Sequence, residues 1–140
     1  MKNLVYEIIA TAGAIEAAGI RILKPFSLTP MSYNILNLLD GPPLSQRQLG
    51  DKLIVVASSV TFQVRQLQQR GLLKRRRQDR RTWLVSLTPE GEARLRSATF
   101  AMDELLARFR VDPQALIVTH DTLGNLKQQI ANADRPALSS

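Results

Sequence analysis

The chain has 140 residues, no cysteine and one histidine, and its formal net charge at pH 7 is +7. A chain of this length forms one domain, or one domain with an attached oligomerisation element. The composition excludes disulfides, thiolate metal sites and a cysteine-based redox switch, and the single His120 gives little basis for a transition-metal site. We therefore expect no metal and no cofactor.

The apolar residues form no uninterrupted run that approaches about 18 residues, which predicts no transmembrane helix and no membrane partner. Glu7 and Glu16 lie where a signal peptide needs its apolar core. The expected location is the cytoplasm.

The positive charge is confined to residues 43–88. This segment holds ten Lys or Arg residues and two acidic residues, a net charge of +8, while the rest of the chain has a net charge of −1. A basic field confined to one third of a small protein is typical of a nucleic-acid contact surface.

Residues 3–23 carry an apolar stripe at helical spacing, which predicts an amphipathic helix. Lys24-Pro25 ends it, because the residue before proline is disfavoured in the helical region. Thr29-Pro30 predicts an N-cap and the first position of a second helix. That helix runs to about Asp40 and stops at Gly41-Pro42-Pro43.

Two short helices follow. Ser45 and Gln48 fit a capping box at the start of the third helix. Ser58 and Ser59 are strong N-cap residues for a fourth helix, which continues to Arg70 and closes at the next residue, a glycine. Two short helices joined by a tight turn form a helix-turn-helix.

Residues 72–77 and 82–87 then read as two strands joined by a turn, because the second segment alternates and is rich in β-forming residues. Thr88-Pro89 begins a fifth helix, and Asp112-Pro113 restarts the chain into a last helix.

Apolar residues recur seven apart on these two helices, at Leu95, Met102 and Phe109 and then at Leu116, Leu123 and Ile130. Two such stripes predict a packing seam. The seam has two interpretations, a dimer interface or an intramolecular core; we favour the dimer because the chain has little else to cover the stripes.

Five successive motifs resemble those of the MarR-type winged helix-turn-helix regulators. They lie at residues 44–49, 58–61, 67–73, 79–81 and 87–91. The resemblance covers residues 28–97 by motif and the whole chain by length and element order. It implies a mainly α fold with a small β-hairpin, in which the winged helix-turn-helix lies between dimerisation helices.

The implied division of the chain has four parts. These are an N-terminal dimerisation helix at 1–28, the DNA-binding domain at 29–90 with its wing at about 73–87, C-terminal dimerisation helices at 91–132, and a flexible tail at 133–140.

The fourth helix is the predicted major-groove helix. With Val60, Val64 and Leu67 facing inward, 100° per residue turns Ser58, Phe62, Arg65, Gln66 and Gln69 outward. An arginine can pair with guanine and a glutamine with adenine. The alternative is an ordinary solvated helix face. Phe62 stands where the family usually has a polar or basic residue, and it either touches a thymine methyl or folds sideways onto the wing or a helix end.

The hairpin carries six basic residues between Lys74 and Arg81 and can reach the adjacent minor groove. The resemblance implies that Asp79 braces an arginine at the wing tip, most simply Arg81, and that Arg80 or Arg81 enters the groove. Asp79 is also an ordinary turn residue. Arg75, Arg76 and Arg77 alternate in direction along a strand, so they do not all face DNA.

The predicted DNA-binding residues are Ser45, Arg47, Ser58, Ser59, Thr61, Phe62, Arg65, Gln66, Arg76, Arg77, Arg80 and Arg81, with Asp79 as the wing-bracing residue. They predict a sequence-specific double-stranded DNA-binding regulator, a repressor, that acts as a homodimer on an inverted repeat.

The resemblance also implies release by a small aromatic or phenolic anion bound between the dimer helices and the DNA-binding domain. Tyr6, Phe26, Tyr33 and Trp83 are candidates to line such a pocket, although aromatic residues at this spacing are more often core, and no effector site is assigned.

Two other functions compete with this interpretation. One is a non-specific architectural or interaction module of the same fold. The other, an enzyme, is the weakest, because the chain has no histidine-bearing triad and Gly13 and Gly19 lie in a helical stripe without a phosphate-binding context. No catalytic residue is predicted.

Overall fold

The computed structural model describes residues 2–53, 55–109 and 112–133. It divides into two compact units, residues 1–105 and 106–140. The first unit contains the helices α1 (Lys2–Leu23), α2 (Pro30–Leu38), α3 (Gln46–Leu53), α4 (Ala57–Gln69) and nearly all of α5 (Pro89–Leu106), with a 3-10 turn at Lys24–Phe26. The second unit contains α6 (Pro113–Ala133).

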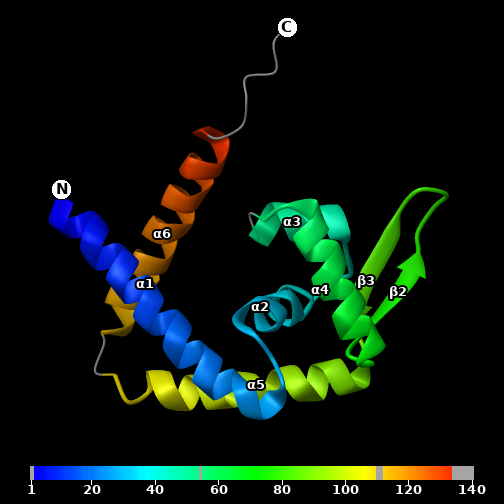
Figure 1. Cartoon of the computed structure of the whole chain (residues 1–140), viewed down its shortest axis with the longest axis horizontal. Helices are drawn as coiled ribbons and strands as arrows, with labels where there is room; N and C mark the ends of the chain where they lie inside the picture. Colours follow the sequence, from blue (N-terminus) through cyan, green and yellow to red (C-terminus); the bar gives the residue numbers. More distant parts are fainter. Residues whose placement is uncertain (1, 54, 110–111, 134–140) are drawn as a thin grey trace, which may run out of the picture. The chain divides into compact units, whose positions relative to one another are not determined.

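The sheet of the first unit has three antiparallel strands in the order β1 (Leu44–Ser45), β3 (Trp83–Leu87), β2 (Leu73–Arg77). Figure 1 shows β2 and β3 projecting as a hairpin beside α4. The predicted fold class, mainly helical with a small hairpin, is confirmed. The two-residue strand β1 was not predicted, because it exists only through its pairing with β3, Leu44 opposite Val85 and Ser45 opposite Leu84.

The predicted helix boundaries are largely confirmed at their caps. Thr29 accepts a hydrogen bond from the Ser32 amide at 3.1 Å, and the Ser32 hydroxyl accepts from the Thr29 amide at 2.7 Å. Ser45 and Gln48 form the predicted capping box, with distances of 2.8 and 3.1 Å. These bonds satisfy amides that have no partner within their helix.

The fourth helix departs from the prediction at its start. It begins at Ala57, and its N-cap is Val56, which makes no side-chain capping bond. The Val56 carbonyl instead accepts from the amides of Ser59 and Val60 at 3.1 and 3.4 Å. Ser58 and Ser59 therefore lie in the first turn with exposed side chains, and the prediction that they cap the helix is wrong.

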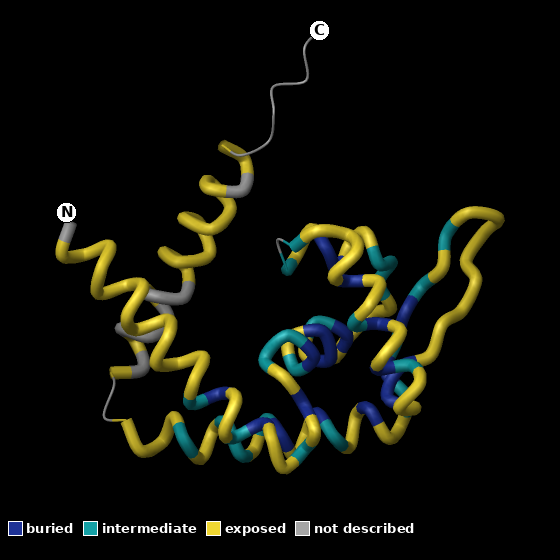
Figure 2. The backbone as a smooth tube through the Cα atoms, viewed as in Figure 1, coloured by how far each residue is buried: buried dark blue, intermediate teal, exposed yellow. Residues whose placement is uncertain are grey.

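The core lies between α2, α3, α4, the first half of α5 and the base of the hairpin, where Figure 2 shows the buried positions. Its buried hydrophobic residues are Leu23, Leu28, Ile35, Leu36, Leu39, Leu49, Val60, Val64, Leu67, Leu72, Leu73, Val85, Leu87, Leu95 and Ala98. The prediction that α4 turns Val60, Val64 and Leu67 inward is confirmed.

The predicted heptad stripe of α5 serves two environments. Leu95 and Ala98 are buried in the core of the first unit, which is the intramolecular interpretation. Phe109, by contrast, lies beyond the end of α5 at Leu106 and is 55% exposed. In α6, Leu123, Leu126 and Ile130 are exposed, while the side chain of Leu116 lies outside the described ones, as does that of His120. The predicted tail lies outside the described residues beyond Ala133.

The helix α1 buries its stripe only near its end. Leu23 is 1% exposed, whereas Leu4, Ile9 and Ile15 are 61%, 66% and 64% exposed. By length and composition, the segment Asn3–Phe26 is also long and apolar enough to cross a membrane, and 6% of its 18-residue apolar window is buried. The prediction from uninterrupted runs missed this, because alanines and glycines between the large apolar residues sustain the average. Length and composition do not distinguish a bilayer from a protein partner.

A junction of backbone groups joins the end of α4, the hairpin and the start of α5. Gly71 has a φ of 72°, and the Leu72 amide donates to the Leu67 carbonyl at 3.0 Å, which closes α4 in a Schellman motif. The Thr88 amide donates to the Leu72 carbonyl at 3.1 Å, and the Thr88 hydroxyl donates to the Gly71 carbonyl at 2.6 Å.

Thr88 also caps α5, because its hydroxyl accepts from the Gly91 amide at 3.0 Å. Gly91 packs directly on the backbone of Leu72, and a Cβ at this position would collide with the Leu72 carbonyl oxygen. The obstruction is backbone, so no side-chain rotation relieves it.

The substitution Gly91→Ala is expected to lower the free energy of unfolding by about 1–3 kcal/mol, as overpacking does elsewhere. Chemical denaturation with circular dichroism measures it. Gly41→Ala is the matched control, because Gly41 is exposed, has nothing within 4 Å of an added Cβ and should change stability little. Equal stability of the two variants would contradict this account of the junction.

Candidate nucleic-acid interface

The outer face of α4 carries most of the predicted base-contacting residues. Ser58, Ser59, Thr61, Phe62, Arg65 and Gln66 are all exposed. Their opposite face is the buried stripe of Val60, Val64 and Leu67. The helix therefore presents its polar and basic side to solvent while its apolar side anchors it to the core.

Phe62 is 59% exposed. It borders a hollow of about 370 Å³ with Met31 of α2 and with Ser58, Ser59 and Gln63 of its own helix. The residues around the hollow belong to α4 and to the start of α2, and none belongs to the wing. This position is compatible with a contact to a thymine methyl and with packing toward a helix end.

Two other predicted residues have structural roles of their own. Ser45 is half-buried in the capping box and pairs with β3. The Thr61 hydroxyl lies 3.0 Å from the Ala57 carbonyl and 3.1 Å from Oε1 of Gln46, so it ties α4 to α3. Arg47 is exposed on α3. Ser45 thus caps α3, and Thr61 links α4 to α3, whether or not they also touch DNA.

The wing tip is built around Asp79, which holds Arg81 through the backbone amide of that residue. Its Oδ1 accepts from the backbone amides of Arg81 and Thr82, both at 2.8 Å. These two bonds lower the pKa of the Asp79 carboxyl below its ordinary value. Within the described part of the chain the one ion pair is Glu90–Arg94, so Asp79 does not pair with the Arg81 guanidinium. Asp79 braces the backbone of the turn instead.

The arginine that is held at the tip is Arg77. Its Nε donates to the Asp79 carbonyl at 3.0 Å, and its second guanidinium nitrogen donates to the Arg80 carbonyl at 2.9 Å. Pattern reasoning missed this role, because the partners are backbone carbonyls that any sequence supplies. Arg80 and Arg81 are exposed at the same turn.

Trp83 orders the arginines of β2. The guanidinium carbon of Arg75 lies 5.0 Å from the centre of the Trp83 ring, and that of Arg77 lies 5.8 Å from it, which is cation–π distance. Arg77 is directly opposite Trp83 in the sheet. Arg76 alternates with them and so projects from the other face of β2. As predicted, the three consecutive arginines do not share one direction.

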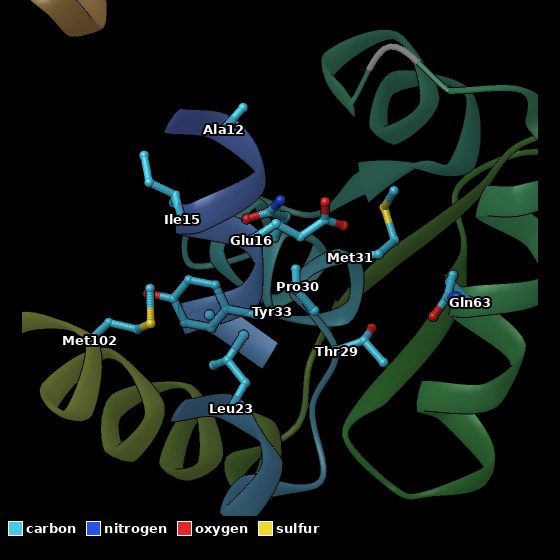
Figure 3. Close-up of a pocket in the computed structure, with 12 residues that line it drawn as sticks. Ala12, Ile15, Glu16, Leu23, Thr29, Pro30, Met31, Tyr33, Gln63 and Met102 are labelled. Atoms are coloured by element: carbon cyan, nitrogen blue, oxygen red, sulfur yellow. The ribbon is translucent and has the colours of Figure 1, made fainter. Parts of the chain in front are cut away.

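A separate cavity of about 730 Å³ lies beside α1 in the same unit (Figure 3). Residues of α1, of the start of α2 and of α5 line it, with Gln63 of α4 at one side. Of the aromatic residues proposed to line a pocket, Tyr33 lines this cavity. Trp83 lies on the wing, Phe26 borders a smaller hollow of about 370 Å³, and Tyr6 is 68% exposed.

No group of three or more His, Cys, Asp or Glu that could hold a metal ion is found among the described residues. The exposed basic groups and the exposed face of α4 are instead suited to phosphates and base edges.

Asp79→Ala is expected to weaken DNA binding by up to about tenfold, because the turn loses both bonds to its carboxylate. Fluorescence anisotropy with labelled DNA measures the affinity. Gln78→Ala is the control, since Gln78 is exposed and its hydrogen bond in the turn is made by its backbone amide.

Because the pKa of Asp79 is lowered on folding, the ionised carboxylate stabilises the turn at pH values above the ordinary pKa of aspartate. This stabilisation is lost as the pH falls through the lowered pKa. In an NMR titration, the amide resonances of Arg81 and Thr82 should shift as Asp79 is protonated. Amide shifts that stay constant across this pH range would contradict the two hydrogen bonds to Asp79.

The family comparison agrees with this geometry. The model of the MarR family matches residues 26–82, which run from the end of the 3-10 turn before α2 to the wing turn before β3. YwoH of Bacillus subtilis (strain 168), an uncharacterized HTH-type transcriptional regulator, is 31% identical over 115 residues, covering 78% of this chain and 84% of that protein.

Two solved structures show the same fold. CouR from Rhodococcus jostii RHA1, bound to p-coumaroyl-CoA, has a TM-score of 0.80 at 24% identity, covering 98% of this chain and 95% of that one. NadR in complex with 4-hydroxyphenylacetate has a TM-score of 0.77 at 22% identity, covering 86% and 89%. The family match over the helix-turn-helix and wing, together with the identity to YwoH, shows that the chain belongs to the MarR family of DNA-binding HTH transcriptional regulators, a family of regulators and not of enzymes.

Proposed function

We propose that this regulator is a cytoplasmic repressor that binds an inverted repeat as a homodimer and is released by a small molecule. The observation that carries the DNA part is the exposed face of α4 beside a hairpin whose arginines have no acidic partner among the described residues. The proposed parts are the dimerisation helix 1–28, the DNA-binding domain 29–90, the dimerisation helices 91–132 and the tail 133–140.

In the proposed complex, α4 enters the major groove and the wing reaches the adjacent minor groove. Arg65 and Gln66 read base edges, Phe62 contacts a thymine methyl, and the hydroxyls of Ser58 and Ser59 bind phosphates at the helix start. Arg80 and Arg81, at the tip of the hairpin, enter the minor groove.

Arg77 orders the wing tip through its two hydrogen bonds to backbone carbonyls of the protein. Arg76 faces the sugar-phosphate backbone of the DNA in this proposal. Arg47, Ser45 and Thr61 complete the phosphate-facing side of the helix-turn-helix.

The dimer is supported by the exposed apolar surface of the described helices. Leu4, Val5, Ile8, Ile9 and Ile15 of α1 are each at least 39% exposed, as are Leu123, Leu126 and Ile130 of α6. On each helix taken by itself, several large apolar residues exposed at helical spacing mark a binding surface. A partner subunit covers it in our proposal, and two α4 helices about 34 Å apart then match successive major grooves.

The effector is supported by the cavity beside α1 and by the relatives. CouR is known with p-coumaroyl-CoA and NadR with 4-hydroxyphenylacetate. The cavity of about 730 Å³ is within the range of small-molecule sites. The cavity is lined by α1, α2 and α5, so a ligand there contacts both the proposed dimer helix and the domain that carries α4. Such a ligand changes the affinity for DNA by as much as its own affinity differs between the DNA-bound and the released arrangement of the dimer.

A selection of random duplex DNA by the purified protein tests the specific-regulator proposal. We expect a palindromic consensus sequence. Arg65→Ala should weaken the base preference at one position of each half-site, and Phe62→Ala should weaken the preference for a thymine. Arg80→Ala/Arg81→Ala should lower affinity for all sequences and reduce the salt slope by about 1.8 per protomer. Arg96→Ala is the control, because it removes an exposed positive charge from α5 outside the basic segment.

Enrichment of no motif, with the wing variant lowering only affinity and salt slope, would favour the non-specific architectural module instead.

The dimer is tested separately by analytical ultracentrifugation. Ile8→Glu places a charge in the apolar stripe of α1 and is expected to shift the protein toward the monomer, with dimer affinity reduced at least about tenfold. Ala10→Glu is the matched control, because at 100° per residue it lies on the opposite side of the same helix. A wild-type protein that sediments as a monomer at micromolar concentration would refute the homodimer.

A further inference from the structure

We infer that the cavity beside α1 selects a lipophilic cation and rejects anions, with Glu16 as the residue that decides ligand charge. The inference rests on the proposed effector function and concerns the chemical class of the effector. It keeps the expected aromatic character of the ligand and reverses its expected charge.

The position of Glu16 on α1 is the first step. Ala12, Ile15, Glu16, Gly19 and Leu23 line the cavity, and this spacing of three or four residues places them on one face of the helix. Glu16 is exposed, and it thus places a solvent-accessible carboxylate on the helix face that borders the cavity. Figure 3 shows it among the labelled lining residues, which include Met31, Tyr33 and Met102.

The second step is the absence of any compensating charge in the lining. None of the cavity-lining residues is Lys, Arg or His, and its other polar side chains, such as Thr29, Asn34 and Gln63, are neutral. In the described part of the chain the one ion pair is Glu90–Arg94, so no basic side chain neutralises Glu16. The nearest basic residues in the sequence, Arg21 and Lys24, are not in the lining.

The third step is the character of the walls. Ile15, Leu23, Met31 and Met102 supply apolar surface, and Tyr33 supplies an aromatic ring that Thr99 fixes through a hydroxyl contact of 3.2 Å. Apolar walls reward burial of a hydrophobic ligand, and the ring face and thioether sulfurs attract a cation or an aromatic group. One carboxylate in such walls favours one positive charge.

An anion in the same cavity would be disfavoured. It would lose water on entering and would face Glu16 without a positive partner. The ligands in CouR and NadR, p-coumaroyl-CoA and 4-hydroxyphenylacetate, both carry negative charge. Among the described residues, the cavity lining has no basic group to receive one, so the proposed effector differs in charge class from the ligands of those proteins.

Tetraphenylphosphonium and tetraphenylborate test the inference, because they have the same shape and opposite charge. Isothermal titration calorimetry of the full chain should show the cation binding at least about tenfold more tightly than the anion. Glu16→Gln, which is nearly isosteric, should weaken binding of the cation by about tenfold and remove most of the difference in affinity between the cation and the anion. Glu7→Gln is the matched control, since Glu7 is exposed on the same helix, as Glu16 is, but lies outside the cavity lining.

Equal or tighter binding of the borate, binding of the cation that Glu16→Gln leaves unchanged, or binding of neither ion would each overturn the inference. DNA release is measured in parallel by anisotropy. A cation that binds through Glu16 without releasing DNA confirms the charge selectivity and refutes the proposed effector response, so the two failures are distinguishable.

Discussion

The arrangement of the DNA-binding surface depends on one backbone junction, where Gly71, Leu72, Thr88 and Gly91 meet. The Schellman motif at the end of α4 turns Leu72 toward the start of α5, where its carbonyl accepts from the Thr88 amide. Gly91 is needed there because any Cβ would strike that same carbonyl. The end of α4, the base of the hairpin and the start of α5 are therefore held by shared contacts, so the wing keeps its place relative to α4.

The hairpin extends past the core, and its tip is ordered without acidic partners for its arginines. Leu73, Val85 and Leu87 bury its base. Beyond them, the Asp79 carboxylate binds two amides, Arg77 binds two carbonyls, and Trp83 stacks with Arg75 and Arg77. Because the Asp79 carboxylate binds amides, and the arginines bind carbonyls and a ring, no guanidinium of the hairpin is paired with a carboxylate among the described residues. The wing therefore keeps a net positive charge that is available to phosphates.

The helix α1 serves two proposed surfaces with one apolar stripe. Its first turns expose Leu4, Ile8 and Ile9, which suits a partner subunit, and its later turns close the cavity. Glu16 lies where these two uses meet. A ligand that holds Glu16 can thus bias the position of a dimer helix, and the energy available for this bias is limited to the difference in ligand affinity between the two arrangements.

The sequence alone determined the features that depend on neighbouring residues. Thr29, Ser45, Gly71 and Thr88 mark real helix ends, and the 100° period of α4 separates its buried stripe from its exposed face, because caps and periodicity arise within a few residues. Tertiary structure alone decided the rest. The strand β1, the start of α4 at Ala57, the role of Arg77, the burial of Leu95 and the cavity around Glu16 all need partners distant in sequence or a backbone path that no local pattern records.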